Sequence, residues 1–267
     1  AVRSCVLPRG DNVLLTRLVF RAVWVVYYKH RTDRAKTYEE RDRVQALYVP
    51  IGLLMLPVVW MALVMIGYTA IYWGMGIRPL EDALTMSGSS LLTLGTVPFV
   101  SLPITLVEFS QATIGLGLVA LLISYLPTMY SAFSRREAMV NMLEVRAGTP
   151  PSAEVFITRL SRIQGLDDLK EMWATYELWF TQIEESHTSL APLNFFRSPD
   201  PKRSWITAAG AILDTAAIMA STVDLPREPR AELCIRAGFL ALRSIADFFQ
   251  FEHNDTPTTD DPISVSK

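Results

Sequence analysis

The sequence has few charged residues, and they are unevenly distributed. Of its 267 residues, 19% are charged and 50% are hydrophobic, whereas charged residues make up about a quarter of an average soluble domain. Between Arg43 and Arg135 only four residues carry a charge: Arg78, Glu81, Asp82 and Glu108. A long stretch almost without charge, flanked by charged regions, is typical of membrane-spanning segments and not of a soluble domain.

The residues of common catalytic and metal-binding motifs are also scarce. Two cysteines, Cys5 and Cys234, exclude a disulfide framework and a cysteine zinc cluster. Three histidines, His30, His187 and His253, show no ligand spacing. The sequence contains no phosphate-binding loop, dinucleotide-binding glycine motif or hydrolase nucleophile motif. The formal net charge of −2 argues against a nucleic-acid partner. We therefore expect no enzyme, no metal site and no nucleic-acid binding.

Two long apolar segments predict membrane-spanning helices. Tyr48–Trp73 covers about 39 Å at about 1.5 Å per residue, enough to cross a hydrocarbon core of about 30 Å. The second segment runs from Ile104 to Phe133 and ends at the charged run 134–137. Basic residues lie outside both segments, whereas residues 74–103 between them hold only Arg78. Because cytoplasmic flanks carry an excess of Lys and Arg, both termini are expected in the cytoplasm.

The uncharged segment Ala83–Val107 is expected to form a re-entrant loop. A third crossing would place one basic flank outside, and the segment is rich in Ser, Thr, Gly and Pro. Non-helical backbone at membrane depth is tolerated only against protein or a water-filled cavity. Pro79 suits a first helical turn, and Glu81 and Asp82 favour a helix N-terminus. Ala83–Leu92 therefore predicts a short helix that is followed by extended chain.

The order of span, short helix, Thr-x-Gly and span resembles the two-transmembrane pore module of the potassium-channel superfamily. Thr93–Gly95 match the first three positions of the T-V-G-Y-G selectivity filter, whereas Thr96 and Val97 depart from the next two. The string Thr93–Pro98 is also similar to the T-I-G-E-T-P filter of cyclic-nucleotide-gated cation channels, without its acidic residue. The resemblance covers about residues 44–135.

The resemblance implies a homotetrameric cation channel, because one chain cannot enclose a pore. Such a filter replaces the hydration shell of an ion with rings of backbone carbonyls. Because the aromatic residue and the second glycine are missing, we expect weak or altered selectivity, with K⁺ or Na⁺ as the permeant ion and no other cofactor. The implied filter residues are Thr93, Leu94, Gly95 and Thr96. The alternative is a tight re-entrant turn in a non-conducting protein.

Five further positions in the second span are candidates for filter support or gating. Glu108 is its only charge, and an intramembrane carboxylate is costly. Three interpretations of Glu108 remain open: it braces the filter, lines the outer pore or lies near the headgroups. Gly115 and Gly117 lie where the superfamily often has a hinge, and Pro127 resembles the inner-helix proline of voltage-gated potassium channels. Close helix packing is the alternative to gating movement. Tyr130 is one of the hydrophobic residues expected near an inner gate.

The flanking regions complete a division into four parts. These are a cytoplasmic N-terminal segment 1–43, a transmembrane pore module 44–135, a cytoplasmic helical domain 136–252 and a disordered tail 253–267. Val13–Tyr28 carries Arg17 and Arg21 and predicts an interfacial amphipathic helix, with a short third crossing as the alternative.

Proline and glycine breaks in the cytoplasmic domain separate four expected helices. The expected ranges are Ser152–Gln164, Asp167–Leu190, Ser204–Val223 and Pro229–Phe251. His187, Arg197 and Asp214 raise the question of a ligand site, although such residues more often cap helices or pair with one another.

The sequence therefore predicts an all-α membrane protein, with two transmembrane helices, a re-entrant pore loop and a cytoplasmic helical bundle. We expect it in a plasma membrane of bacterial type, in contact with membrane lipids. The leading hypothesis is a passive cation channel whose cytoplasmic domain assembles it or responds to an unidentified cytoplasmic regulator. The runner-up is a non-conducting membrane receptor or scaffold whose cytoplasmic helical domain binds a partner.

Overall fold

The structure is a computed structural model that describes residues 14–29, 31, 37–95, 101–163, 165, 169–198, 200–223 and 228–252. This described part is all-helical, as the sequence predicts, and has no strand. Its elements are α2 (Leu14–Val23), a π-helical segment η1 (Trp24–Lys29), α4 (Tyr38–Gly74), α5 (Leu80–Leu91), α6 (Leu102–Ala147), α7 (Ala153–Arg162), α8 (Lys170–Ser189), a 3-10 segment η2 (Ala191–Phe195), α9 (Trp205–Ser221) and α10 (Pro229–Phe248).

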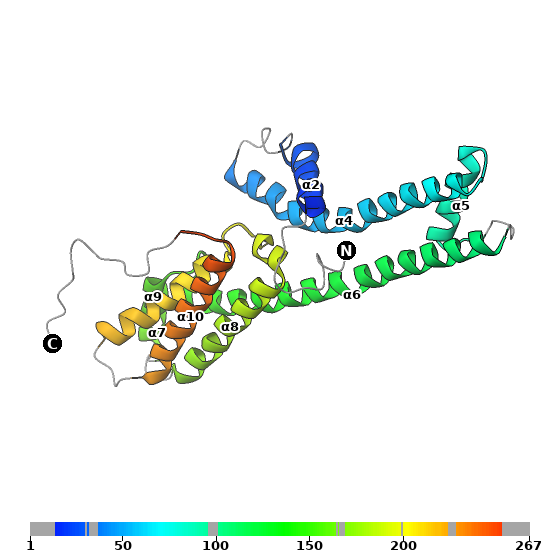
Figure 1. The fold of residues 1–267 in the computed structure, drawn as a ribbon. Helices are drawn as coiled ribbons and strands as arrows, with labels where there is room; N and C mark the ends of the chain where they lie inside the picture. The colour runs from blue at the N-terminus through cyan, green and yellow to red at the C-terminus, as the bar shows by residue number, and fades with distance from the viewer. Residues whose placement is uncertain are drawn as a thin grey trace.

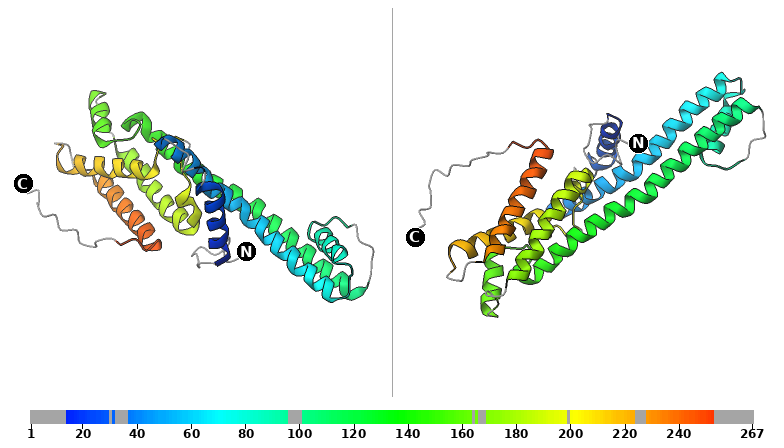
Figure 2. Two further views of the ribbon diagram at one scale, coloured as in Figure 1. Left: turned by 90° about the horizontal axis from the view of Figure 1, so that it is seen from above. Right: turned by 60° about the horizontal axis from the view of Figure 1, so that its bottom comes forward.

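Two long helices, α4 and α6, run side by side along the molecule (Figures 1 and 2). They contain 37 and 46 residues, which corresponds to about 55 and 70 Å at about 1.5 Å per residue. Only 28% and 17% of their most apolar windows are buried, whereas the core helix of a soluble protein is mostly buried. Both helices are therefore long and apolar enough to cross a membrane, and they present that apolar surface outward.

Local signals explain where these helices begin and end. Thr37 accepts a hydrogen bond from the Glu40 amide through its side chain and caps α4. Pro103 occupies the first turn of α6, where its missing N–H has no cost, and Gly148 ends α6 with a φ of 81°. Because α4 starts at Tyr38 and α6 continues to Ala147, both expected boundaries of the pore module, at residues 44 and 135, fall inside helices.

The N-terminal helix α2 packs on the first third of α4, at a glycine. A Cβ on Gly52 would lie 2.4 Å from the Phe20 ring, so any side chain at this position would displace that ring. The Tyr48 hydroxyl donates to the Phe20 carbonyl at 3.0 Å, and Val19 and Val23 are buried against α4. The segment Val13–Tyr28 is thus helical where described, and its position relative to a membrane stays a prediction.

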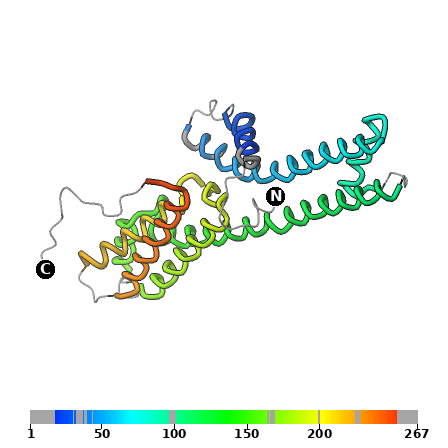
Figure 3. The backbone as a smooth tube through the Cα atoms, viewed as in Figure 1, coloured from blue at the N-terminus to red at the C-terminus, as the bar shows by residue number. Residues whose placement is uncertain are grey.

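The helices α7–α10 pack around the last turns of α6 and form what we call the helical cluster (Figure 3). They begin and end within a few residues of the four expected ranges. Close packing of α10 requires a small residue, because a Cβ on Gly238 would lie 2.6 Å from Leu213 and 3.0 Å from the Phe180 ring. The fully buried core residues include Trp173, Tyr176, Trp179, Phe180 and Ile212. The expected tail 253–267 lies outside the described residues.

Candidate functional site

The short helix α5 folds back between the ends of α4 and α6 (Figure 1), and the buried side chain of Gln111 holds it there. Gln111 Nε2 donates to the carbonyl oxygen of Ser87 at 3.0 Å and to its Oγ at 2.7 Å. Gln111 Oε1 accepts from the Tyr72 hydroxyl at 3.0 Å. Ser87 Oγ in turn donates to the Met65 carbonyl at 2.9 Å. One amide thus ties three helices together, and its polar atoms are satisfied as burial requires.

The far end of α5 touches the first third of α6 at Gly115. A Cβ at this position would lie 2.3 Å from the Leu91 carbonyl oxygen, so a side chain cannot be added without displacing α5. Gly115 is 13 residues from Leu102, or about 20 Å at about 1.5 Å per residue. Close packing therefore accounts for Gly115. Nothing lies within 4 Å of a Cβ built on Gly117.

The residues after α5 form a left-handed helix terminus. The Thr93 amide donates to the Ser90 carbonyl at 3.2 Å, and the Leu94 amide donates to the Ser89 carbonyl at 2.9 Å. These two bonds define a Schellman motif, in which Thr93 takes the position that usually belongs to glycine. Thr93 has a φ of 56° and Gly95 a φ of 68°. A β-branched residue with positive φ is a rare conformation, and such strain clusters at functional sites.

Three of the four expected filter residues can thus be placed, and they lie on the surface of the single chain. Thr93, Leu94 and Gly95 are exposed, with Leu94 63% exposed. The Thr93 hydroxyl donates to the Leu92 carbonyl at 2.7 Å. Thr96 lies outside the described residues.

The other expected site residues are spread along α6 and do not meet. Glu108 is half-buried and has no hydrogen bond or ion pair with any residue that the structure describes. Gln111, one turn further on, holds α5 through Ser87 and Tyr72, and the three interpretations of Glu108 stay predictions. Pro127 is exposed inside the continuous helix, and Tyr130 is 69% exposed. Tyr130 lies 15 residues beyond Gly115, or about 22 Å along the helix.

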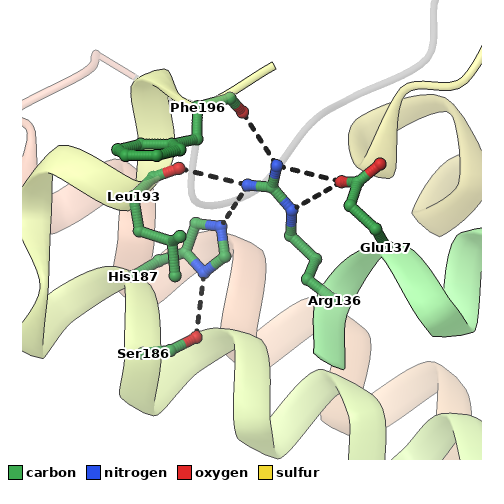
Figure 4. A network of polar contacts seen from close by, with 6 residues as sticks. All are labelled: Arg136, Glu137, Ser186, His187, Leu193 and Phe196. Carbon is green, nitrogen blue, oxygen red and sulfur yellow. Dashed lines mark hydrogen bonds and ion pairs between the residues drawn. The ribbon is translucent and has the colours of Figure 1, made fainter. Parts of the chain in front are cut away.

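A second polar network, which the sequence did not indicate, surrounds Arg136 near the far end of α6 (Figure 4). Arg136 is 3% exposed. Its guanidinium donates to Glu137 Oε1 at 3.0 and 3.1 Å, to the Leu193 carbonyl at 3.1 Å and to the Phe196 carbonyl at 2.8 Å. Its Nη1 also lies 3.2 Å from His187 Nε2. The pKa of Arg136 lies below the ordinary value for arginine, because burial lowers this pKa by more than the neighbouring Glu137 carboxylate raises it.

His187 takes part in this network as a neutral acceptor. Burial and the neighbouring Arg136 charge lower the pKa of His187 to about 3. Its Nδ1 lies 2.9 Å from the Ile183 carbonyl, so this nitrogen carries the proton and Nε2 accepts from Arg136. His187 is therefore uncharged at neutral pH.

The segment held by Arg136 connects the helical cluster to both long helices. Leu193 is fully buried in a cluster that includes Val49 of α4 and Met129 of α6. The Phe196 ring lies 5.6 Å from the Phe133 ring, and Arg197 forms an ion pair with Asp42 of α4. We call residues 190–197 the wedge. The wedge therefore contacts α4 and α6 as well as the buried Arg136 network.

The three residues that raised the question of a ligand site are not brought together. His187 faces Arg136, Arg197 pairs with Asp42, and Asp214 is exposed on α9. No group of three or more His, Cys, Asp and Glu side chains in the described ranges has the spacing to hold a metal ion. Comparison with protein-family models, curated proteins and solved structures finds no match to this chain.

Proposed function

We propose that the chain is one subunit of a homotetrameric cation channel, in which α4, α5 and α6 form the pore module. In this arrangement α4 and α6 cross the membrane, α5 is a re-entrant helix, and the helical cluster lies in the cytoplasm with both termini. The weakly selective path for K⁺ or Na⁺ is lined by Thr93–Thr96. The membrane is a plasma membrane of bacterial type.

The observation that carries this proposal is the course of α5. It turns back along two helices with exposed apolar surfaces and ends about 20 Å along α6, at Gly115. There the chain leaves the helix with two positive φ angles and exposes Thr93–Gly95. Helical backbone that ends at membrane depth is tolerated where it lines a water-filled path. The C-terminal partial negative charge of four such helices favours cations.

Flux through liposomes that contain the purified protein tests the proposal. Gly95→Ala should abolish cation flux, because alanine is strained at a φ of 68° and the filter backbone would shift. Gly210→Ala is the matched control, because its Cβ also meets open space in a helix, and α9 lies outside the proposed pore module. Equal flux in the two variants, or none in the wild-type protein, contradicts the proposal.

The second candidate is a non-conducting receptor or scaffold, and the wedge is the observation that favours it. A signal received by the helical cluster can reach α4 and α6 through Arg136 and Arg197 without any ion passing. Assembly symmetry separates the two functions: a two-fold dimer without a central axis favours the receptor, whereas four-fold symmetry favours the channel.

A further inference from the structure

A pocket lies between α6 and α8, just beyond the apolar part of α6. Its volume is about 210 Å³, and its lining includes Ala132 and Arg135 from α6 with Trp179, Gln182, Glu185 and Ser186 from α8. A single water needs only about 15 Å³ of such space. The pocket therefore has room for a small polar group that is larger than one water molecule.

An unsatisfied hydrogen-bond donor belongs to the lining of this pocket. Trp179 is 1% exposed, with its ring packed against the rings of Tyr176 and Phe180. Its Nε1 is buried and has no hydrogen-bond partner within the part of the chain that the structure describes. Buried polar groups are nearly always paired, so an exception calls for an explanation. An acceptor bound in the pocket would lie beside this ring.

The N–H donors around the pocket favour a hydrogen-bond acceptor such as an anion. Arg135 donates one bond to Ser131 Oγ at 2.7 Å, and a guanidinium has five N–H donors. Arg136 also lines the pocket, although its charge is paired with Glu137. The remaining charges of the lining, Arg135 and Glu185, balance each other. The preference for an acceptor therefore comes from the N–H donors of Arg135, Trp179 and Gln182 rather than from net positive charge.

We propose that this pocket binds a single phosphate group through the Arg135 guanidinium, the Trp179 indole N–H and the Gln182 amide. Arginine is suited to phosphate because it offers parallel donors to two oxygens. Arg135 follows the last apolar turn of α6, at Phe133. In the orientation of the proposed function, this point lies at the inner headgroups, where anionic lipids gather. The phosphate is thus carried either by a lipid or by a solute.

Two binding measurements on the full chain distinguish these sources. Calorimetric titration of the detergent-purified protein with inorganic phosphate tests a soluble ligand. Native mass spectrometry after reconstitution into nanodiscs of phosphatidylcholine with phosphatidylglycerol counts retained anionic lipid, against nanodiscs of phosphatidylcholine alone. Binding of either probe supports the site, and binding of phosphatidylglycerol alone assigns it to lipid. Binding of neither overturns the proposal.

Two substitutions test the named donors. Trp179→Phe keeps the ring and removes the N–H, and Arg135→Gln removes the charge. Each should weaken binding about tenfold, as expected for a hydrogen bond to a charged group. Two matched controls lie outside the pocket lining: Trp173→Phe in the same helix, and Arg236→Gln at an exposed position of α10. Both should bind within about twofold of the wild-type protein.

An unchanged affinity in Trp179→Phe overturns the assignment, provided that the variant melts like its Trp173→Phe control. The lipid arm rests on the proposed membrane orientation, but neither binding assay depends on ion conduction. A protein that binds phosphate and passes no ions would refute the channel and leave the pocket intact.

Discussion

Two buried polar side chains, Gln111 and Arg136, determine how the segments of this molecule meet. Gln111 joins α4, α5 and α6, and Arg136 joins α6 to the wedge. Apart from Glu137, which is next to Arg136, the partners of these side chains described above lie 24 to 60 residues away in the sequence. No local pattern reports such pairing, which explains why sequence reasoning selected Glu108 and missed Gln111. The signal that the sequence offered for this role was Gln111 itself, an uncharged amide side chain inside an apolar span.

Replacing Gln111 with leucine should loosen α5. The change leaves the Ser87 carbonyl and the Tyr72 hydroxyl without their buried partner, at a cost of about 1–3 kcal/mol per unsatisfied group. Hydrogen exchange should accelerate across Leu80–Leu91 and leave the helical cluster unaffected. Thr113→Ala is the control, because Thr113 is exposed on α6 and its hydroxyl donates only to the Phe109 carbonyl of the same helix, at 2.8 Å. Unchanged protection of α5 in Gln111→Leu would refute this role.

The His187 interaction predicts how stability depends on pH. The pKa of about 3 in the folded protein lies below the ordinary value of about 6.5. Between these values the unfolded chain binds more protons than the folded chain, so stability falls as pH falls through this window. The melting temperature of the wild-type protein should therefore drop from pH 7 to pH 5. In His187→Gln the drop should be smaller, and parallel curves would contradict the pairing.

At the scale of elements, helix-breaking residues and the distribution of charge predicted the positions of the helices well. Proline and glycine breaks located α7–α10 to within a few residues, and the charge-free runs located the apolar parts of α4 and α6. The full length of the two long helices was harder to predict. The charged residues after Phe133 end the apolar run, but they do not end the helix, because Arg136 is buried against the wedge.

The contact between α5 and α6 predicts that alanine has opposite effects on thermal stability at Gly115 and at Gly117. Gly115→Ala forces the Leu91 carbonyl away, at a cost of about 1–3 kcal/mol as in other overpacked sites. Gly117→Ala meets open space and should stabilise α6 by about 0.5–1 kcal/mol, since alanine favours helix. Thermal unfolding in one detergent should rank Gly117→Ala above wild type and Gly115→Ala below it. The reverse order would exclude the close approach.

At the scale of the whole molecule, one chain leaves much apolar surface uncovered. Large side chains are exposed on both long helices, among them Leu54, Ile66, Leu106, Phe109 and Ile123. Lipid and neighbouring chains together would cover this surface. In the proposed channel, the exposed Thr93–Gly95 segment would line a pore only when copies of the chain surround a common axis.

The channel proposal predicts that native mass spectrometry of the detergent-purified protein gives a mass of four chains. Each chain has a mass of 29.9 kDa, so a tetramer has a mass of about 120 kDa. Closed symmetry of this kind is usual for homo-oligomers. A dimer of about 60 kDa would favour the receptor.

Recording current across a planar bilayer that contains the purified wild-type tetramer tests the central claim most directly. The channel account predicts discrete current steps, with a reversal potential that follows the cation gradient and only weakly separates K⁺ from Na⁺. A folded, tetrameric preparation that leaves the bilayer electrically tight would contradict it.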